Sequence, residues 1–240
     1  MGTYLCTEIA FPPLPKLKVP ALYLGAHGEL FSYATLERDG LAFTMARATI
    51  PPGKGPPAHL HHYVHEWFYA PEGGITLFAA EAEHKDLVNH PNLKDGTQVT
   101  VHLIPLKAGQ VFCSTRHHVH GYVNTDSVER PIMCIWKPDH DAPHFEPYND
   151  GGTREFFEGV HKKVEDPNQL PELSENRRKH YISQSPNYFV PHSFHLFQFI
   201  NRVDPEIPPS MQHSERFEEL DQMLALIRNY NEGDHTIRCL

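Results

Sequence analysis

Apolar and polar positions follow different patterns in the two halves of the chain. Between about residues 41 and 140, short runs rich in Val, Ile, Phe, Tyr and Thr are broken by Gly and Pro, which is typical of β-strands. The predicted strands lie at 41–50, 65–70, 75–80, 97–106, 109–115, 120–125 and 130–138. Strands this short and this regularly spaced favour a β-sandwich or a small barrel.

After residue 150 the apolar positions recur at helical spacing instead. Helices are predicted at 153–163, 174–182 and 214–230. The last of these begins at Ser214, a good N-cap residue. Its apolar stripe consists of Phe217, Leu220, Leu224 and Ile227. We expect this stripe to dock on the barrel or on a partner subunit and assign it no catalytic role.

The chain has 240 residues, enough for one well-cored domain with extensions. The predicted organisation begins with an N-terminal arm at 1–40, whose short strands pack on the barrel. The barrel itself occupies 41–150, and a helical C-terminal extension occupies 151–240.

Charge and composition argue against several classes of protein. The formal net charge is −9 and no long basic block occurs, which argues against a nucleic-acid partner. No run of 18 apolar residues predicts a membrane span, and the N-terminus lacks the pattern of a signal peptide. The four cysteines are scattered without a C-x-x-C pair, so we expect reduced thiols and a cytoplasmic protein.

The stretch HLHHYVHEWFY at 59–69 concentrates four histidines and a glutamate in a chain that has 19 histidines. If 58–62 is a strand, His59 and His61 point to the same face, because side chains alternate with period two. Glu66 would begin the next strand across a turn. Two histidines and one carboxylate in this arrangement can bind a divalent metal.

A further ligand is expected from a neighbouring strand within 115–124. His118 and His120 would share one face of that strand, and His117 would lie on the other. His62 and His65 fall on the wrong face or in the turn and are expected at the surface.

These residues resemble the cupin superfamily. Its first motif, G-x5-H-x-H-x4-E-x6-G, is matched at every position by Gly53, His59, His61, Glu66 and Gly73. A match at five spaced positions is a specific signal.

The second cupin motif, G-x5-P-x-G-x2-H-x3-N, is matched at Gly109, His120 and Asn124. Thr115 and His117 stand where the motif has Pro and Gly, so the turn before His120 is the part of the resemblance in question. Asn124 is expected to make structural hydrogen bonds.

The resemblance implies a mainly β fold, a cupin-type antiparallel barrel or jelly roll. It also implies one divalent metal ion per chain, held by His59, His61, Glu66 and His120. Iron is the expected metal, with Mn, Ni, Cu or Zn as alternatives. The segment at 132–160 is similar in texture to quercetin 2,3-dioxygenase-like cupins. The family further implies a homodimer.

Five residues are expected to line the substrate pocket of this barrel. Phe68, Tyr122 and Met45 would point inward by alternation and make the pocket apolar. Arg47 has the same parity as Met45 and would pair with a substrate carboxylate or phenolate if it faces inward. His118 shares the face of His120.

Three imidazoles and one carboxylate leave about two open positions on an octahedral metal. Together with the resemblance, this favours a dioxygenase that acts with O2 on a small phenolic or enol-type molecule, with Glu66 as both ligand and catalytic base. One alternative is non-redox isomerase, cyclase or lyase (decarboxylase) chemistry at the same site. Another is a non-catalytic barrel that binds a small molecule.

Overall fold

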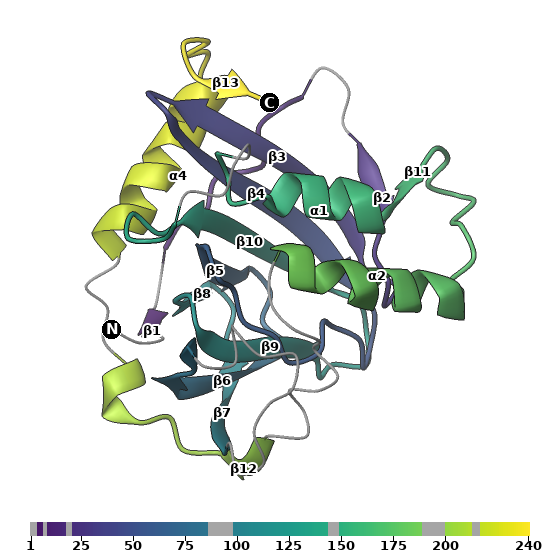
Figure 1. The fold of residues 1–240 in the computed structure, drawn as a ribbon. Coiled ribbons are helices and arrows are strands. Elements are labelled where there is room, and N and C mark those ends of the chain that lie inside the picture. The colour runs from purple at the N-terminus through teal and green to yellow at the C-terminus, as the bar shows by residue number, and fades with distance from the viewer. Residues whose placement is uncertain are drawn as a thin grey trace.

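The computed structural model describes residues 4–6, 9–17, 21–85, 98–143, 149–188, 200–212 and 217–240. Two β-sheets face each other, and helices from the last third of the chain cover the larger one (Figure 1). The predicted fold class, a mainly β antiparallel barrel with an N-terminal arm and C-terminal helices, is confirmed.

Within the described residues, the larger sheet has nine strands in the order β1-β8-β5-β10-β4-β3-β2-β11, and β13 pairs with β3. Its neighbouring strands run antiparallel. Its strands are β1 (Tyr4–Cys6), β2 (Leu22–Leu24), β3 (Leu30–Arg38), β4 (Leu41–Ile50), β5 (Val64–Ala70), β8 (Gln110–Ser114), β10 (Arg130–Pro138), β11 (Lys162–Val164) and β13 (Arg238–Cys239).

The smaller sheet has four strands in the described part of the chain, in the order β12-β7-β6-β9. β6 pairs antiparallel with β7 and β9, whereas β12 runs parallel to β7. Its strands are β6 (Ile75–Glu83), β7 (Val99–Leu106), β9 (His118–Asn124) and β12 (Ile200–Asp204).

The helices lie on opposite faces of the larger sheet. α1 and α2 lie over the inner face, and α4 packs on the outer face (Figure 1). The helices are α1 (Thr153–Val160), α2 (Glu175–Tyr188) and α4 (Phe217–Asn231), together with the 3-10 turn η2 (Pro209–Met211). Within α4, Leu220, Leu224 and Ile227 are buried as predicted, and Phe217 is partly buried. Ser214 lies outside the described residues.

β4 is buried on both faces, which gives the molecule two apolar cores. Ala46 and Ala48 face the space between the sheets, where they join Phe68, Tyr122 and other inner residues. Met45 faces the other way and packs with residues of α4. Each core removes a continuous apolar surface from water, and this burial is the main favourable term in folding.

The predicted strands at 41–50, 65–70, 75–80 and 130–138 coincide with β4, β5, β6 and β10 to within a few residues. The segment 58–62 differs, because it is not a strand: His59 forms only an isolated bridge with His120. The helix at 174–182 extends further than predicted, to Tyr188.

Strands from both ends of the chain complete the sheets. β2 and β3 come from the predicted arm, and β11, β12 and β13 come from the predicted helical extension. The division into three segments stays a prediction.

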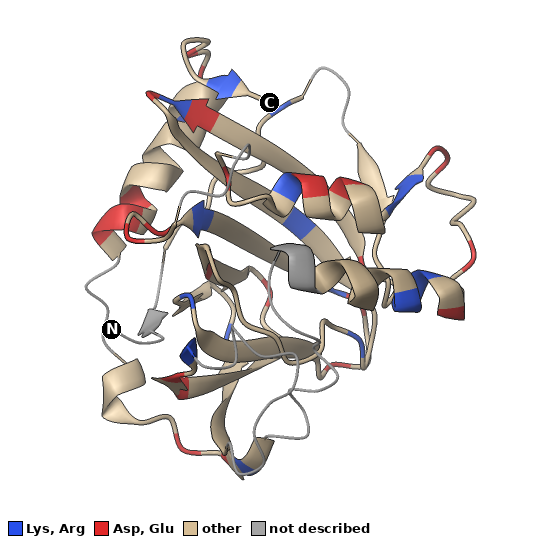
Figure 2. Cartoon of the chain, viewed as in Figure 1, with Lys and Arg blue, Asp and Glu red and all other residues tan. Residues whose placement is uncertain are grey.

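Acidic and basic residues are mixed along α1 and α2 (Figure 2). The first turn of α4 carries Glu218 and Glu219 and its last turn carries Arg228, which suits the dipole of the helix. None of the described helices is long and apolar enough to cross a membrane.

Candidate metal centre

The four predicted ligands come from three places in the fold and meet between the two sheets. His59 and His61 lie in the segment before β5, Glu66 lies in β5, and His120 lies in β9. Backbone hydrogen bonds join this segment to β9: the N–H of His59 donates to the carbonyl of His120 at 2.8 Å, and the reverse bond is 2.7 Å. The N–H of His117 donates to the carbonyl of His61 at 2.9 Å. This pairing holds ligands that are 59 or more residues apart in the chain within one site.

One ligand atom from each of His59, His61, Glu66 and His120 lies within 4.8 Å of the others. The Oε2 atom of Glu66 is at their centre, 2.7 Å from Nε2 of His61, 3.1 Å from Nε2 of His120 and 3.9 Å from Nε2 of His59. His61, Glu66 and His120 are buried. The predicted ligand set is therefore brought together in the structure and could hold a metal ion.

The outer ring nitrogens of two ligands are held by backbone carbonyls. Nδ1 of His59 lies 2.8 Å from the carbonyl of Pro57, and Nδ1 of His120 lies 2.8 Å from the carbonyl of His118. Because a carbonyl only accepts, each Nδ1 carries the proton and donates it. Each Nε2 then presents a lone pair to the site, which is the form of histidine that binds a metal.

This arrangement of lone pairs tests whether the site fits a cation. Nε2 of His120 and Oε2 of Glu66 are then two acceptors at 3.1 Å from each other. Two facing acceptors repel, and a cation bound between them would remove this repulsion. The hydroxyl of Ser114 lies 2.8 Å from Nδ1 of His120 and adds a second polar contact behind the ring. The residues therefore fit a metal ion.

The pKa values of Glu66, His59 and His61 also suit a metal site. Burial alone would raise the pKa of Glu66, but the His120 and His61 rings beside the carboxylate outweigh burial and hold that pKa far below its usual range. Burial, followed by the proximity of His120 and His61, lowers the pKa of His59 well below its usual value. Burial also lowers the pKa of His61. A carboxylate beside neutral imidazoles is the state in which these groups bind a divalent ion.

The turn before His120 keeps the conformation that the second motif requires, although His117 replaces its glycine. His117 has a φ of 68°, in the left-handed region that non-glycine residues rarely adopt. This conformation costs a non-glycine residue roughly 1 to 2 kcal/mol. Histidine at this position therefore strains the turn, and the turn keeps the left-handed conformation that suits glycine.

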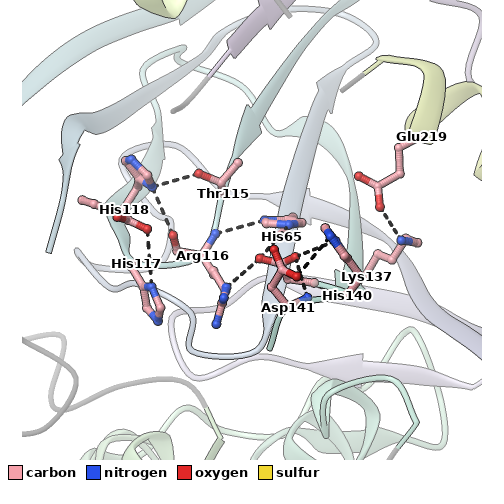
Figure 3. Close-up of polar contacts among 11 residues, drawn as sticks. His65, Thr115, Arg116, His117, His118, Lys137, His140, Asp141 and Glu219 are labelled. Atoms are coloured by element: carbon pink, nitrogen blue, oxygen red, sulfur yellow. Dashed lines mark hydrogen bonds and ion pairs between the residues drawn. The ribbon is translucent and has the colours of Figure 1, made fainter. Parts of the chain in front are cut away.

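Polar contacts hold this turn in place (Figure 3). The Oγ1 atom of Thr115 lies 2.9 Å from Nδ1 of His118. The backbone N–H of Arg116 donates to Nδ1 of His65 at 3.1 Å, and the Arg116 guanidinium pairs with Asp139 at 2.6 Å. His65 is buried, and its Nε2 lies 3.3 Å from Oδ2 of Asp139, so the expectation that it lies at the surface is wrong.

Of the five residues expected in the pocket, only Tyr122 lines it in the described structure. Phe68 lies inside the barrel beside His120, with the ring centroids 5.6 Å apart. His118 is buried in the turn before His120, where it takes part in the polar contacts shown in Figure 3. Met45 packs under α4 and Arg47 is exposed, because the odd positions of β4 face away from the barrel interior. Met45 and Arg47 share one face of β4, as predicted, but that face points away from the pocket.

Asn124 makes structural hydrogen bonds, as predicted. Its amide donates to the carbonyls of Ile50 and Val128, and its side-chain oxygen accepts the N–H of Asp126 at 2.9 Å. Asn124 thereby ties the end of β9 to the end of β4.

The metal centre opens into a pocket between the barrel and the helices. Both ends of the chain contribute to its walls, which sequence reasoning did not predict. Its lining residues are Ala26, His27, Glu29, Phe31, Pro56, His59, His61, Glu66, Tyr122, Trp136, Phe157, His161 and Tyr181. No motif marks Glu29, His161 or Tyr181, because they reach the pocket only through the packing of the N-terminal arm, α1 and α2.

No protein-family model and no curated protein sequence matches the chain. Solved structures with a similar fold include KdgF from a Halomonas species, at 13% identity and a TM-score of 0.32, covering 46% of this chain and 81% of that one. The cupin domain of Cnp3 from Schizosaccharomyces pombe has 14% identity and a TM-score of 0.33, covering 45% and 61%. A predicted oxalate decarboxylase from Thermotoga maritima has 16% identity and a TM-score of 0.36, covering 53% and 100%.

The motif residues of the sequence and the site that they form point to the same family. His59, His61, Glu66 and His120 come together in one site, as the resemblance to the cupin motifs implies. The narrower likeness to quercetin 2,3-dioxygenase-like cupins is not specifically shown. The resemblance of this chain to the cupin superfamily thus extends from its motif residues to the site that they form.

Proposed function

We propose that this protein is a metal-dependent dioxygenase that acts on a small phenolic or enol-type molecule. The observation that carries the proposal is the position of three histidines and one glutamate at an aromatic-lined pocket. A purely structural or storage barrel has no need to gather four ligand side chains, three of them buried, around one point.

Four protein ligands would leave open positions on a bound Fe, Mn, Ni or Cu ion, which supplies redox chemistry between a coordinated substrate oxygen and O2. His59, His61 and His120 would hold the ion through Nε2. Glu66 would complete the ligand set and accept the proton of the substrate hydroxyl that binds there. The backbone carbonyls behind His59 and His120 keep both rings in the orientation that this role requires.

The pocket walls suit a flat, apolar substrate. Phe31, Tyr122, Trp136, Phe157 and Tyr181 supply five aromatic rings to the lining. Aromatic side chains pack well against planar rings and exclude water from them. Polar groups are confined to a few positions, which is typical of pockets that orient a small molecule.

Oxygen consumption tests this proposal most sharply. Untagged protein loaded with Fe(II) is placed in an oxygen electrode with simple phenols and catechols. The proposal expects oxygen uptake that needs both substrate and metal, that is lost in His120→Ala and that persists in His62→Ala. His62 is a matched control because it is a neighbouring histidine outside the ligand cluster.

The possible outcomes separate the competing functions. Substrate conversion without oxygen uptake would contradict the dioxygenase and support isomerase, cyclase or lyase chemistry at the same four residues. Substrate binding without conversion, whatever metal is added, would contradict both and support a binding barrel. The predicted homodimer stays a prediction.

A further inference from the structure

The pocket contains a second group of polar side chains that takes no part in the metal centre. Glu29 lies directly before β3, His27 lies two residues earlier in the same turn, and His161 caps the C-terminal end of α1. All three line the pocket together with His59, His61 and Glu66. None of the three belongs to the ligand cluster found among the described residues.

The turn holds the carboxylate of Glu29 in a fixed position. The backbone N–H of His27 donates to Oε2 of Glu29 at 3.0 Å, and the N–H of Gly25 donates to the carbonyl of Glu29 at 2.7 Å. A Cβ atom on Gly25 would lie 2.5 Å from Oε2 of Glu29 and 2.9 Å from the ring of Phe31. Glycine at position 25 therefore leaves the space that the Glu29 carboxylate occupies.

The surroundings of Glu29 place it between ionised and protonated states near neutral pH. The side chain is 3% exposed, and burial raises its pKa to about 7. The N–H of His27 and the charges of Lys54 and Arg178 oppose this rise. A carboxyl group with a pKa near the working pH is suited to both accepting and releasing a proton.

Two tyrosines relate Glu29 to the metal centre. The charges of both Glu29 and Glu66 raise the pKa of Tyr122 and of Tyr181, after the larger effect of burial. Both tyrosines line the same pocket as Glu29 and Glu66. A flat molecule resting against these rings would have Glu66 at one edge and Glu29 at another.

The two histidines beside Glu29 have free hydrogen-bonding capacity. Within the described residues, Nε2 of His27 and Nδ1 of His161 are buried without a hydrogen-bond partner. Burial lowers the pKa of His27 to about 4 and that of His161 to about 3, so both rings are neutral at pH 7. A buried polar atom without a partner costs roughly 1 to 3 kcal/mol, and a ligand oxygen or hydroxyl would supply the partner.

We propose that Glu29 is a second proton-accepting residue, which takes the proton of a substrate hydroxyl lying away from the metal-binding oxygen. His27 and His161 hydrogen-bond to the substrate at the same end of the pocket. The inference rests on the proposed function and narrows its substrate class. The substrate is a flat phenolic or enol-type molecule with oxygen atoms at two separate edges.

The proton transfer balances without a further reactant. The O–H bond of the substrate hydroxyl breaks, its electron pair stays on the oxygen, and the proton bonds to the carboxylate of Glu29. The products are a phenolate or enolate and a neutral carboxylic acid, and no electron is exchanged. The negative charge moves from Glu29 onto the substrate ring, where it makes the ring richer in electrons.

The ionisation of a bound phenol tests this step without turnover. The probe is 4-nitrophenol, whose ionised form absorbs visible light, titrated onto the metal-loaded protein at pH 8, where Glu29 is ionised before the probe binds. We expect the wild type to take up about one proton from the buffer for each ionised probe that it binds, because Glu29 becomes neutral beside the bound phenolate, and we expect Glu29→Gln to take up none. Glu155→Gln is the matched control, since burial also raises the pKa of Glu155, which lies on α1 outside the pocket lining.

The same titration in His120→Ala separates this inference from the proposed function. If the difference between the wild type and Glu29→Gln also appears in the His120→Ala background, the role of Glu29 is supported even where oxygen uptake is lost. Equal proton uptake in the wild type and Glu29→Gln would overturn the inference. An equal loss in Glu155→Gln would overturn it too, because the effect would then not come from the pocket. Carboxyl absorption in the infrared, titrated with pH, checks that the lost group is Glu29 and that the variant is folded.

Discussion

The pocket contains two buried glutamates, and their surroundings drive their pKa values in opposite directions. Two imidazole nitrogens contact the carboxylate of Glu66, and its pKa lies far below the usual range. One backbone N–H reaches the carboxylate of Glu29, and burial raises its pKa to about 7. Two groups of one chemical type thus differ through their neighbours: Glu66 is ionised at neutral pH and can bind a cation, and Glu29 can gain or lose a proton near that pH.

The largest expected effect is a loss of metal affinity at the Glu66 end of the pocket. His61→Ala removes the histidine closest to Glu66 and leaves its carboxylate buried without that contact. We expect a loss of metal affinity of at least about a hundredfold, since even residues behind the ligands contribute ten- to a hundredfold. Calorimetric titration with Mn(II) or Co(II) measures it. His62→Ala should keep the wild-type affinity, and the reverse order of the two variants would show that the ligand set is misassigned.

A large effect on stability is expected at the other end of the pocket. Burial lowers the pKa of His161 to about 3, and its ring packs against both Phe31 and Phe157, with the ring centroids 4.8 Å from each. Because the folded pKa lies below the unfolded value, the stabilisation is complete above pH 6.5 and is lost as the pH falls toward 3.

His161→Phe removes this titration. Relative to the variant, the wild type should lose about 4 to 5 kcal/mol of unfolding free energy between pH 7 and pH 3. Urea unfolding of both proteins at several pH values measures the difference. A constant difference across this range would show that His161 is protonated without cost in the folded protein.

The variant Glu29→Gln tests whether the pKa of Glu29 is raised in the folded protein. The folded pKa of Glu29, about 7, lies above its ordinary value of 4.5. Its stabilising contribution is therefore complete below pH 4.5 and is lost as the pH rises through 7. Raising the pH from 4 to 8 should cost the wild type about 3 kcal/mol more than Glu29→Gln. Parallel pH profiles of unfolding free energy would contradict the raised pKa.

The smallest effect concerns the orientation of one ligand. The hydroxyl of Ser114 contacts Nδ1 of His120 at 2.8 Å, and the carbonyl of His118 contacts the same atom. Ser114→Ala removes only the first of these contacts. Metal affinity should fall by about tenfold, at the lower end of the range for such residues. Metal titration against Thr76→Ala, which removes a half-buried hydroxyl on β6 that contacts Thr125, provides the baseline.

The sequence predicts the metal centre well because its ligands are marked by local spacing. His59, His61 and Glu66 lie within eight positions, and His120 is identified by its distance from Gly109 and Asn124. The strand at 41–50 was also predicted in full. Alternation along it correctly put Met45 and Arg47 on one face. It does not tell which face is inside when a strand is buried on both, and here α4 covers the outer one.

The end of the pocket that contains Glu29 and His161 could not be predicted from local patterns. Glu29 precedes the predicted barrel at 41–150, and His161 and Tyr181 follow it. Only the packing of β3, α1 and α2 brings them to one cavity. His65 shows the same limit on a smaller scale, because its ion pair with Asp139 comes from a residue 74 positions away.

The central claim is that His59, His61, Glu66 and His120 bind one metal ion. Elemental analysis of the untagged wild type and of His120→Ala, purified side by side, tests it most directly. The account predicts near one equivalent of a divalent transition metal per chain in the wild type and its loss in the variant. Wild-type protein that takes up no more metal than His120→Ala, even after incubation with Fe(II), Mn(II), Ni(II) and Cu(II), would contradict it.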